Sequence, residues 1–149
     1  MKKDPVVRHT GDYRWEGVEI LNYKNEGAHF QAITRQVLFD GVPELPCQLR
    51  YFEIAPGGYS TLERHQHVHR VFVLRGRGQA LLGQEIVDLK EFDLVTIGPC
   101  QWHQFRGTGN EPFGFLCLVN AERDQPQLPG REELKKLRSN PAVDDFIRV

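Results

Sequence analysis

The sequence predicts an all-β fold, an antiparallel sandwich or barrel of seven or so strands. Between Phe30 and about Val119, short segments rich in β-branched and aromatic residues recur, separated by Gly, Pro or Asp. Each segment has the length of a strand. Several of them alternate apolar and polar residues, which is typical of a strand with one buried face. No helical pattern lies between the segments, so the strands are expected to pack against one another.

The predicted strands follow one another closely through a barrel core at about residues 30–119. In order they are FQAITRQVLF (30–39), CQLRYFEI (47–54), RVFVLRG (70–76), GQALLG (78–83), DLVTI (93–97), WHQFRG (102–107) and FGFLCLV (113–119). The glycines of Arg75–Gly76–Arg77–Gly78 fit a hairpin turn, which often needs positive φ. Because no helix follows this turn, a phosphate-binding loop is not expected there.

Two flanks complete a single predicted domain of 149 residues. Residues 1–28 are polar and interrupted by glycine, and we interpret them as an N-terminal arm. Residues 129–149 form a predicted helical segment, because REELKKLRS places Leu134 and Leu137 on one face of a helix. We therefore expect one or two short helices to lie against the barrel.

Composition argues against several classes of partner. Lysine plus arginine (19) nearly balances aspartate plus glutamate (20), which gives a net charge of −1. Nucleic-acid binding normally needs a strongly basic face, so neither nucleic acid nor an anionic membrane is an expected partner. No apolar run approaches the ~20 residues that span a bilayer. The first residues, MKKDPVVRHTGDYRW, also lack the apolar stretch of a signal peptide.

The three cysteines, Cys47, Cys100 and Cys117, are an odd number, lie far apart and form no CxxC pair. This pattern argues against both a disulfide framework and a thiolate zinc site, and it favours a reduced, cytoplasmic setting. We interpret each cysteine as a small buried apolar residue rather than a nucleophile.

Clustered histidines are the clearest sign of chemistry. His65, His67 and His69 alternate within LERHQHVHRVFVLRG, and His103 follows a proline-containing turn in GPCQWHQFRG. Alternate residues of a strand share a face, and neutral imidazole is the commonest ligand of zinc, copper, iron and nickel. A carboxylate at Glu63 would complete a mixed nitrogen and oxygen site. The pattern therefore predicts a metal site, although histidines that line a polar surface would look similar.

The same region resembles the cupin superfamily, in particular small single-domain bacterial cupins of the conserved-barrel type. The segment PGGYSTLERHQHVHRVFVLRGRG resembles the first cupin motif: five residues follow Gly57 before the histidine-bearing segment, and six separate His69 from Gly76. After fifteen further residues, FDLVTIGPCQWHQFRG resembles the second motif, with His103 as its single ligand. The resemblance covers about residues 45–119. It implies a double-stranded β-helix (jelly-roll) barrel, here with short C-terminal helices.

Two registers of the first motif are open. In the first, Glu63 stands where the family has its first histidine and His69 stands where it has its glutamate. The implied ligands are then Glu63, His65, His69 and His103, and the motif spacing is preserved. In the second, His65 and His67 form the family's His-x-His pair, which leaves no glutamate at the fourth position. His67 is therefore a ligand, a residue beside the ligands or a substrate contact.

The resemblance implies one divalent transition metal per chain, either Zn, Ni, Fe, Mn or Cu, and a small-molecule ligand in the barrel. Gln101, Trp102 and Phe105 are candidates to line its cavity. Such a centre suits a metal-dependent enzyme of the dioxygenase, isomerase, lyase or decarboxylase type. The alternative is a non-catalytic module that binds a small molecule or a metal. The family commonly forms homodimers, so a homodimer is expected. The substrate does not follow from the fold.

Overall fold

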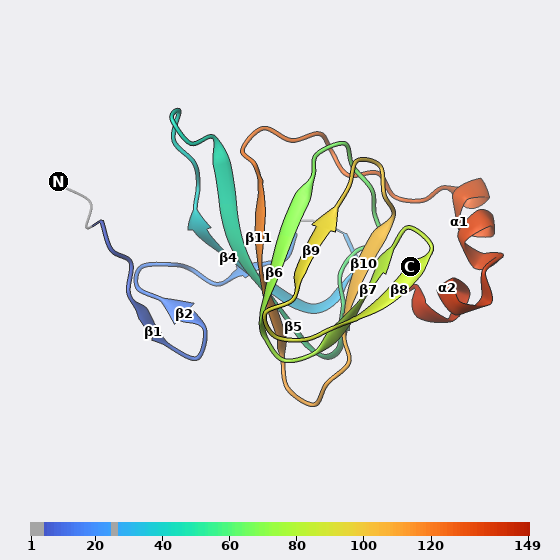
Figure 1. Ribbon diagram of the computed structural model, residues 1–149, viewed down its shortest axis with the longest axis horizontal. Coiled ribbons are helices and arrows are strands. Elements are labelled where there is room, and N and C mark those ends of the chain that lie inside the picture. Colours follow the sequence, from blue (N-terminus) through green and yellow to red (C-terminus); the bar gives the residue numbers. More distant parts are fainter. Residues whose placement is uncertain (1–4, 25–26) are drawn as a thin grey trace.

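In the computed structural model, which describes residues 5–24 and 27–149, antiparallel strands curl into two facing layers (Figure 1). The first layer contains, in spatial order, β3 (Leu21–Asn22), β4 (Gln31–Phe39), β5 (Cys47–Tyr59), β11 (Phe113–Asn120), β6 (His69–Arg75) and β9 (Leu94–Ile97). The second layer contains β8 (Glu85–Leu89), β7 (Gly78–Leu82), β10 (His103–Gly107) and the end of β5. The arm carries β1 (His9–Gly11) and β2 (Arg14–Trp15), and the C-terminal segment carries α1 (Arg131–Arg138) and α2 (Pro141–Phe146). This is the predicted double-stranded β-helix with short C-terminal helices.

Strand β5 is long because its two ends pair with different layers. Ile54 pairs with Phe113 of β11, whereas Tyr59 pairs with Arg106 of β10. Between these positions Gly57 has a φ of +80°, a conformation that glycine adopts without steric cost. The bend at Gly57 passes the chain from one layer to the other and curls the sheet around its interior.

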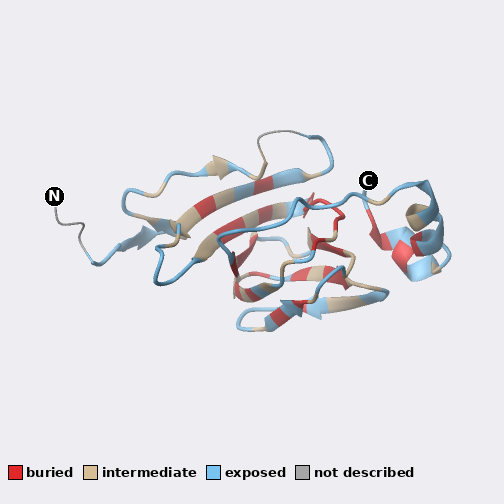
Figure 2. Ribbon diagram, turned by 90° about the horizontal axis from the view of Figure 1, so that it is seen from above, coloured by how far each residue is buried: buried red, intermediate tan, exposed pale blue. Residues whose placement is uncertain are grey.

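Apolar side chains fill the space between the two layers, and Figure 2 shows the buried positions along the strands. Strand β11 illustrates the alternation that places them there: Phe115, Cys117 and Val119 are buried, whereas Leu118 and Asn120 are exposed. Successive side chains of a strand point to opposite faces. Residue 117 therefore faces the interior of the barrel.

The helices lie against the barrel, as predicted, and they pack on the second layer. A second apolar cluster joins them to the strands and contains Leu62, Leu81, Leu137, Val143, Phe146 and Ile147. Beyond α2, the fully buried side chain of Gln104 fixes the chain terminus. Its Nε2 donates to the carbonyl oxygen of Arg148 at 2.8 Å, and its Oε1 accepts from the Arg148 N–H at 2.9 Å.

The structure differs from the sequence prediction in two elements. Strand β8 was not predicted, because Glu85 and Asp88 interrupt its apolar pattern. The turn at Gly76 has the expected positive φ of +69°, but it does not close a hairpin. Strand β6 pairs with β9 and β11, whereas β7 pairs with β8 and β10, so this turn connects the two layers. Within residues 5–24 and 27–149, none of the helices has the length and apolar character needed to cross a bilayer.

The N-terminal arm packs against the outside of the first layer and then reaches the barrel mouth. The ring of Tyr13 stacks on Tyr51 at 5.8 Å between centroids, and Trp15 meets the same ring edge-on at 5.4 Å. Further along the arm, Tyr23 and Lys24 line the interior cavity. The arm therefore contributes side chains to the site as well as to the outer face of the sheet.

Candidate metal centre

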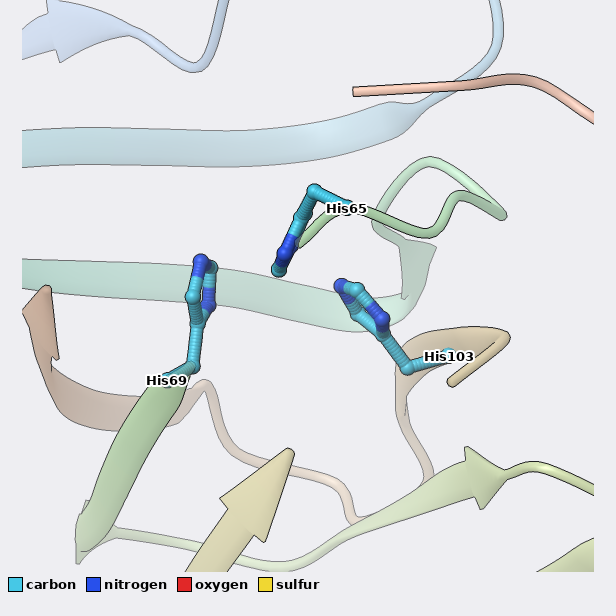
Figure 3. Close-up of side chains that lie close together, drawn as sticks. All are labelled: His65, His69 and His103. Carbon is cyan, nitrogen blue, oxygen red and sulfur yellow. The ribbon is translucent and has the colours of Figure 1, made fainter. Parts of the chain in front are cut away.

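Three histidines from separate parts of the fold face one another inside the barrel (Figure 3). His65 lies in the loop before β6, His69 begins β6 and His103 begins β10. Their candidate ligand nitrogens all lie within 4.8 Å of one another. His65 and His103 are buried and His69 is half-buried. We call these three residues the histidine cluster.

Backbone carbonyls determine which ring nitrogen is left free. Nδ1 of His65 lies 2.8 Å from the carbonyl oxygen of His67, and Nδ1 of His103 lies 2.9 Å from that of Gln101. A carbonyl oxygen only accepts, so each Nδ1 carries the proton and each Nε2 presents a lone pair. Nε2 of His65 is buried and has no hydrogen-bond partner among the described residues. Because an unpaired buried acceptor is costly, this atom fits a metal ligand.

Burial keeps the cluster neutral. It lowers the pKa of His65, and it lowers the pKa of His103 to about 4. Burial also lowers the pKa of His69, with the nearby His65 and His103 rings acting in the same direction. Neutral imidazole is the form that binds transition metals. The donor set therefore suits zinc, nickel, iron, manganese or copper better than calcium or magnesium.

His67 packs against this cluster from the side of the connector that follows β11. Its ring stacks on His65 at 3.7 Å between centroids, and its Nε2 lies 3.0 Å from Nε2 of His69. At that separation two nitrogens need a proton or a cation between them. Asp124 accepts hydrogen bonds from the backbone N–H of Gln66 and from the backbone and Nδ1 of His67. These donors lower the pKa of Asp124 and tie the connector to the cluster.

Glu63 faces the same cavity, but its carboxylate is bound to a lysine. Lys24 Nζ donates to Glu63 Oε2 at 2.6 Å, and the Glu63 side chain is only 8% exposed. The backbones of Glu63 and His103 pair with each other, which holds the carboxylate beside the cluster. Among the described residues, the close group of candidate ligands consists of the three histidines without Glu63.

A cavity of about 200 Å³ opens onto the cluster. Its apolar wall contains Ile33, Phe52, Val71, Phe105 and Phe115. Of the three residues predicted to line it, Phe105 does so, and the structure places Gln101 and Trp102 elsewhere. Gln101 Oε1 accepts from the Gly98 N–H at 3.1 Å, and Trp102 packs against the apolar cluster under the helices. Successive side chains along a strand point to opposite faces, and His103 points into the barrel. Trp102, the residue before it, therefore points outward.

Cys117 is the functional candidate that sequence reasoning missed. It is buried and lines the cavity, whereas Cys47 is half-buried and Cys100 is exposed, so the predicted burial of all three cysteines is corrected. Sγ of Cys117 lies 3.4 Å from Nδ1 of His69 and 3.5 Å from Nη2 of Arg50. Burial raises the pKa of this thiol, and Arg50 opposes that effect. No local motif marks Cys117, because strand pairing alone brings it to the cluster.

Known proteins match this chain in both sequence and fold. The family model described as the cupin domain matches residues 50–119. 1-Methylthio-D-xylulose 5-phosphate methylsulfurylase of Rhodospirillum rubrum is 55% identical over 144 residues, which cover 96% of this chain and 92% of that protein. The crystal structure of a cupin 2 conserved barrel domain protein from Rhodopseudomonas palustris has a TM-score of 0.91 at 50% identity, covering 97% of this chain and 99% of that one. A cupin-2 domain structure from Rhodospirillum rubrum has a TM-score of 0.84 at 52% identity and covers 96% of both chains.

Proposed function

This chain belongs to the cupin domain family, and on that premise we propose that it is a metal-dependent enzyme that removes the methylthio group from 1-methylthio-D-xylulose 5-phosphate or a close analogue. One observation carries the proposal: the histidine cluster and the thiol of Cys117 share one cavity. The 55% identity to a methylsulfurylase supplies the substrate class. It also supports transfer of a methylthio group, with cleavage of a carbon–sulfur bond, as the reaction type in place of the dioxygenase, isomerase, lyase and decarboxylase types expected from the sequence.

The cluster residues His65, His69 and His103 would hold the metal. Two of them present Nε2 lone pairs because their Nδ1 atoms donate to carbonyls. Three protein ligands leave coordination positions for substrate, as in catalytic rather than structural sites. A divalent transition metal bound there would act as a Lewis acid on the ketone oxygen of the substrate.

Cys117 would accept the methylthio group. When Nε2 of His69 is a ligand, its Nδ1 carries the proton and donates to the Cys117 sulfur, and Arg50 Nη2 is a second donor. Both contacts stabilise the thiolate, which is the nucleophilic form. The thiolate attacks the methylthio sulfur: an S–S bond forms, the C1–S bond breaks, and the electron pair moves into the C1–C2–O unit as an enolate.

Protonation at C1 then gives the 1-deoxy ketose phosphate. The ammonium group of Lys24 lies in the same cavity and would be the proton donor. The methyl disulfide left on Cys117 requires a second thiol as co-reactant. A low-molecular-weight thiolate attacks it, leaves with the methylthio group as a mixed disulfide, and restores the Cys117 thiolate. Atoms and electrons therefore balance over one turnover.

The test is incubation of the metal-loaded protein with 1-methylthio-D-xylulose 5-phosphate and dithiothreitol, with products identified by mass spectrometry. We expect the 1-deoxy product from the wild type and from Cys47→Ser, because Cys47 lies outside the cavity. Cys117→Ser should retain its metal and lose turnover. Full activity of Cys117→Ser would overturn the role of the thiol. Recovery of intact substrate from the wild type would favour the alternative, a non-catalytic binding module.

A further inference from the structure

We propose that Arg35, Arg50 and Arg123 form an anion subsite in the cavity and that this subsite takes the phosphate monoester of a sugar phosphate. The identity of the sugar rests on the proposed function. The arginines themselves are placed by the fold, since all three line the cavity that opens onto the histidine cluster.

Strand register brings two of these arginines to one face of the first layer. Arg50 of β5 pairs with Val37 of β4, and Arg35 lies two residues before Val37 on the same strand. Residues two apart on a strand point to the same side, so both side chains face the interior. Arg123 comes from the connector after β11, where its Nη1 donates to the carbonyl oxygen of Asn120 at 2.9 Å.

These arginines have no carboxylate partner among residues 5–24 and 27–149, as none of them forms an ion pair there. Nε of Arg50 is buried and also lacks a hydrogen-bond partner within these ranges. Arg35 and Arg50 are half-buried, whereas Arg123 is exposed. Taking a cation out of water is costly unless it is paired and hydrogen-bonded, so this cost falls on Arg35 and Arg50. The planar guanidinium fork matches phosphate oxygens bidentately, so a phosphate would satisfy both requirements.

The other charged side chains of the cavity already have partners. Lys24 is bound to Glu63 at 2.6 Å, and the Asp124 carboxylate accepts a hydrogen bond from Nδ1 of His67 at 2.7 Å. The arginines are therefore the positive charges left without a carboxylate partner in the described part of the cavity, and their described hydrogen bonds go to the carbonyl oxygens of Asn22 and Asn120 and to the sulfur of Cys117. A substrate anion would bind to these arginines rather than compete for an existing pair.

The arginines also disfavour one another electrostatically. Burial, and then the charge of Arg50, lower the pKa of Arg35. The same two causes, in the same order, lower the pKa of Arg123. Like charges that share one cavity repel, and an anion bound among them offsets that repulsion.

Calorimetric titration of the protein with D-xylulose 5-phosphate and with D-xylulose tests this subsite, because neither sugar carries a methylthio group. We expect the wild type to bind D-xylulose 5-phosphate at least about tenfold more tightly than D-xylulose. Arg35→Gln and Arg123→Gln should each weaken binding of D-xylulose 5-phosphate by about tenfold or more and leave binding of D-xylulose unchanged. Arg77→Gln is the matched control, since Arg77 is exposed and lies outside the cavity.

The same titrations on metal-depleted protein separate the arginines from a direct contact between metal and phosphate. A preference for the phosphorylated sugar that disappears with the metal, or that survives both arginine substitutions, would overturn the subsite. Thermal unfolding of each variant checks that the fold is retained. Failure of the proposed function, seen as absent turnover of the methylthio substrate, would leave the phosphate preference intact. Loss of the preference with turnover retained would overturn the subsite alone.

Discussion

Replacing Lys24 with methionine isolates the ion pair that holds Glu63 in the cavity. The two charged atoms lie 2.6 Å apart, and the Glu63 side chain is 8% exposed. Removing one partner of a fully buried pair costs about 3–5 kcal/mol, because the other charge is left uncompensated. The Lys24 side chain is 31% exposed, so water screens part of the interaction. We therefore expect Lys24→Met to lower the free energy of unfolding of the metal-free protein by about 1–2 kcal/mol.

Urea unfolding of Lys24→Met, Glu63→Gln and the double variant measures this pair as a double-mutant cycle. Metal affinity of the same proteins tests whether Glu63 is a ligand. Loss of a residue that only supports a ligand lowers metal affinity by about 10–100-fold, and loss of a ligand costs more. Because the three histidines are the ligands, Glu63→Gln should lower metal affinity by less than about 10-fold. A loss of more than about 100-fold in Glu63→Gln, with tighter metal binding in Lys24→Met, would refute the account.

Three further predictions concern stability and the connector. The pKa of His103 is about 4 in the folded protein and near 6.5 when unfolded, so the unfolded state binds more protons between these values. Urea unfolding of the metal-free protein should show stability falling as pH drops through this window. His103 alone contributes about 3 kcal/mol of this loss, and His65 and His69, whose pKa values are also lowered, add to it. A flat profile would contradict the burial of a neutral His103. Gln104→Met should lower the free energy of unfolding by about 2–4 kcal/mol, since the buried carbonyl of Ser60 and the backbone N–H and carbonyl of Arg148 lose their partner. Deletion of Arg148–Val149 should then add little further loss. Asp124→Asn should speed amide exchange at Gln66 and His67, and unchanged exchange would show that the connector is held by other contacts.

Local patterns carried much of the fold prediction. The alternation in FGFLCLV located β11, and the apolar face of REELKKLRS located α1, because both are properties of neighbouring residues. Strand partners are not local properties. The turn at Gly76 looks like a hairpin in sequence, yet pairing with β11 and β10 pulls its two strands into different layers. Strand β8 was missed for a different reason, because Glu85 and Asp88 interrupt the apolar pattern of its own residues.

In the candidate site, too, residues in local motifs were predicted and residues brought in by long-range pairing were not. The histidines belong to two short motifs, so their spacing alone indicated a cluster, and His65, His69 and His103 do converge. Lys24 comes from the arm and Cys117 from β11, and neither carries a motif. They reach the cavity only because long-range pairing folds the arm and β11 around it. The sequence therefore predicted Glu63 as a metal ligand, whereas in the structure its carboxylate is bound to Lys24.

Elemental analysis of the purified, reconstituted protein tests the central claim most directly. We expect about one transition-metal ion per chain in the wild type and in His29→Ala, because His29 is exposed and lies apart from the cluster. His103→Ala should retain little metal, since it removes one of three ligands. Full occupancy in His103→Ala, or no metal in the reconstituted wild type, would contradict the assignment of the histidine cluster as a metal centre.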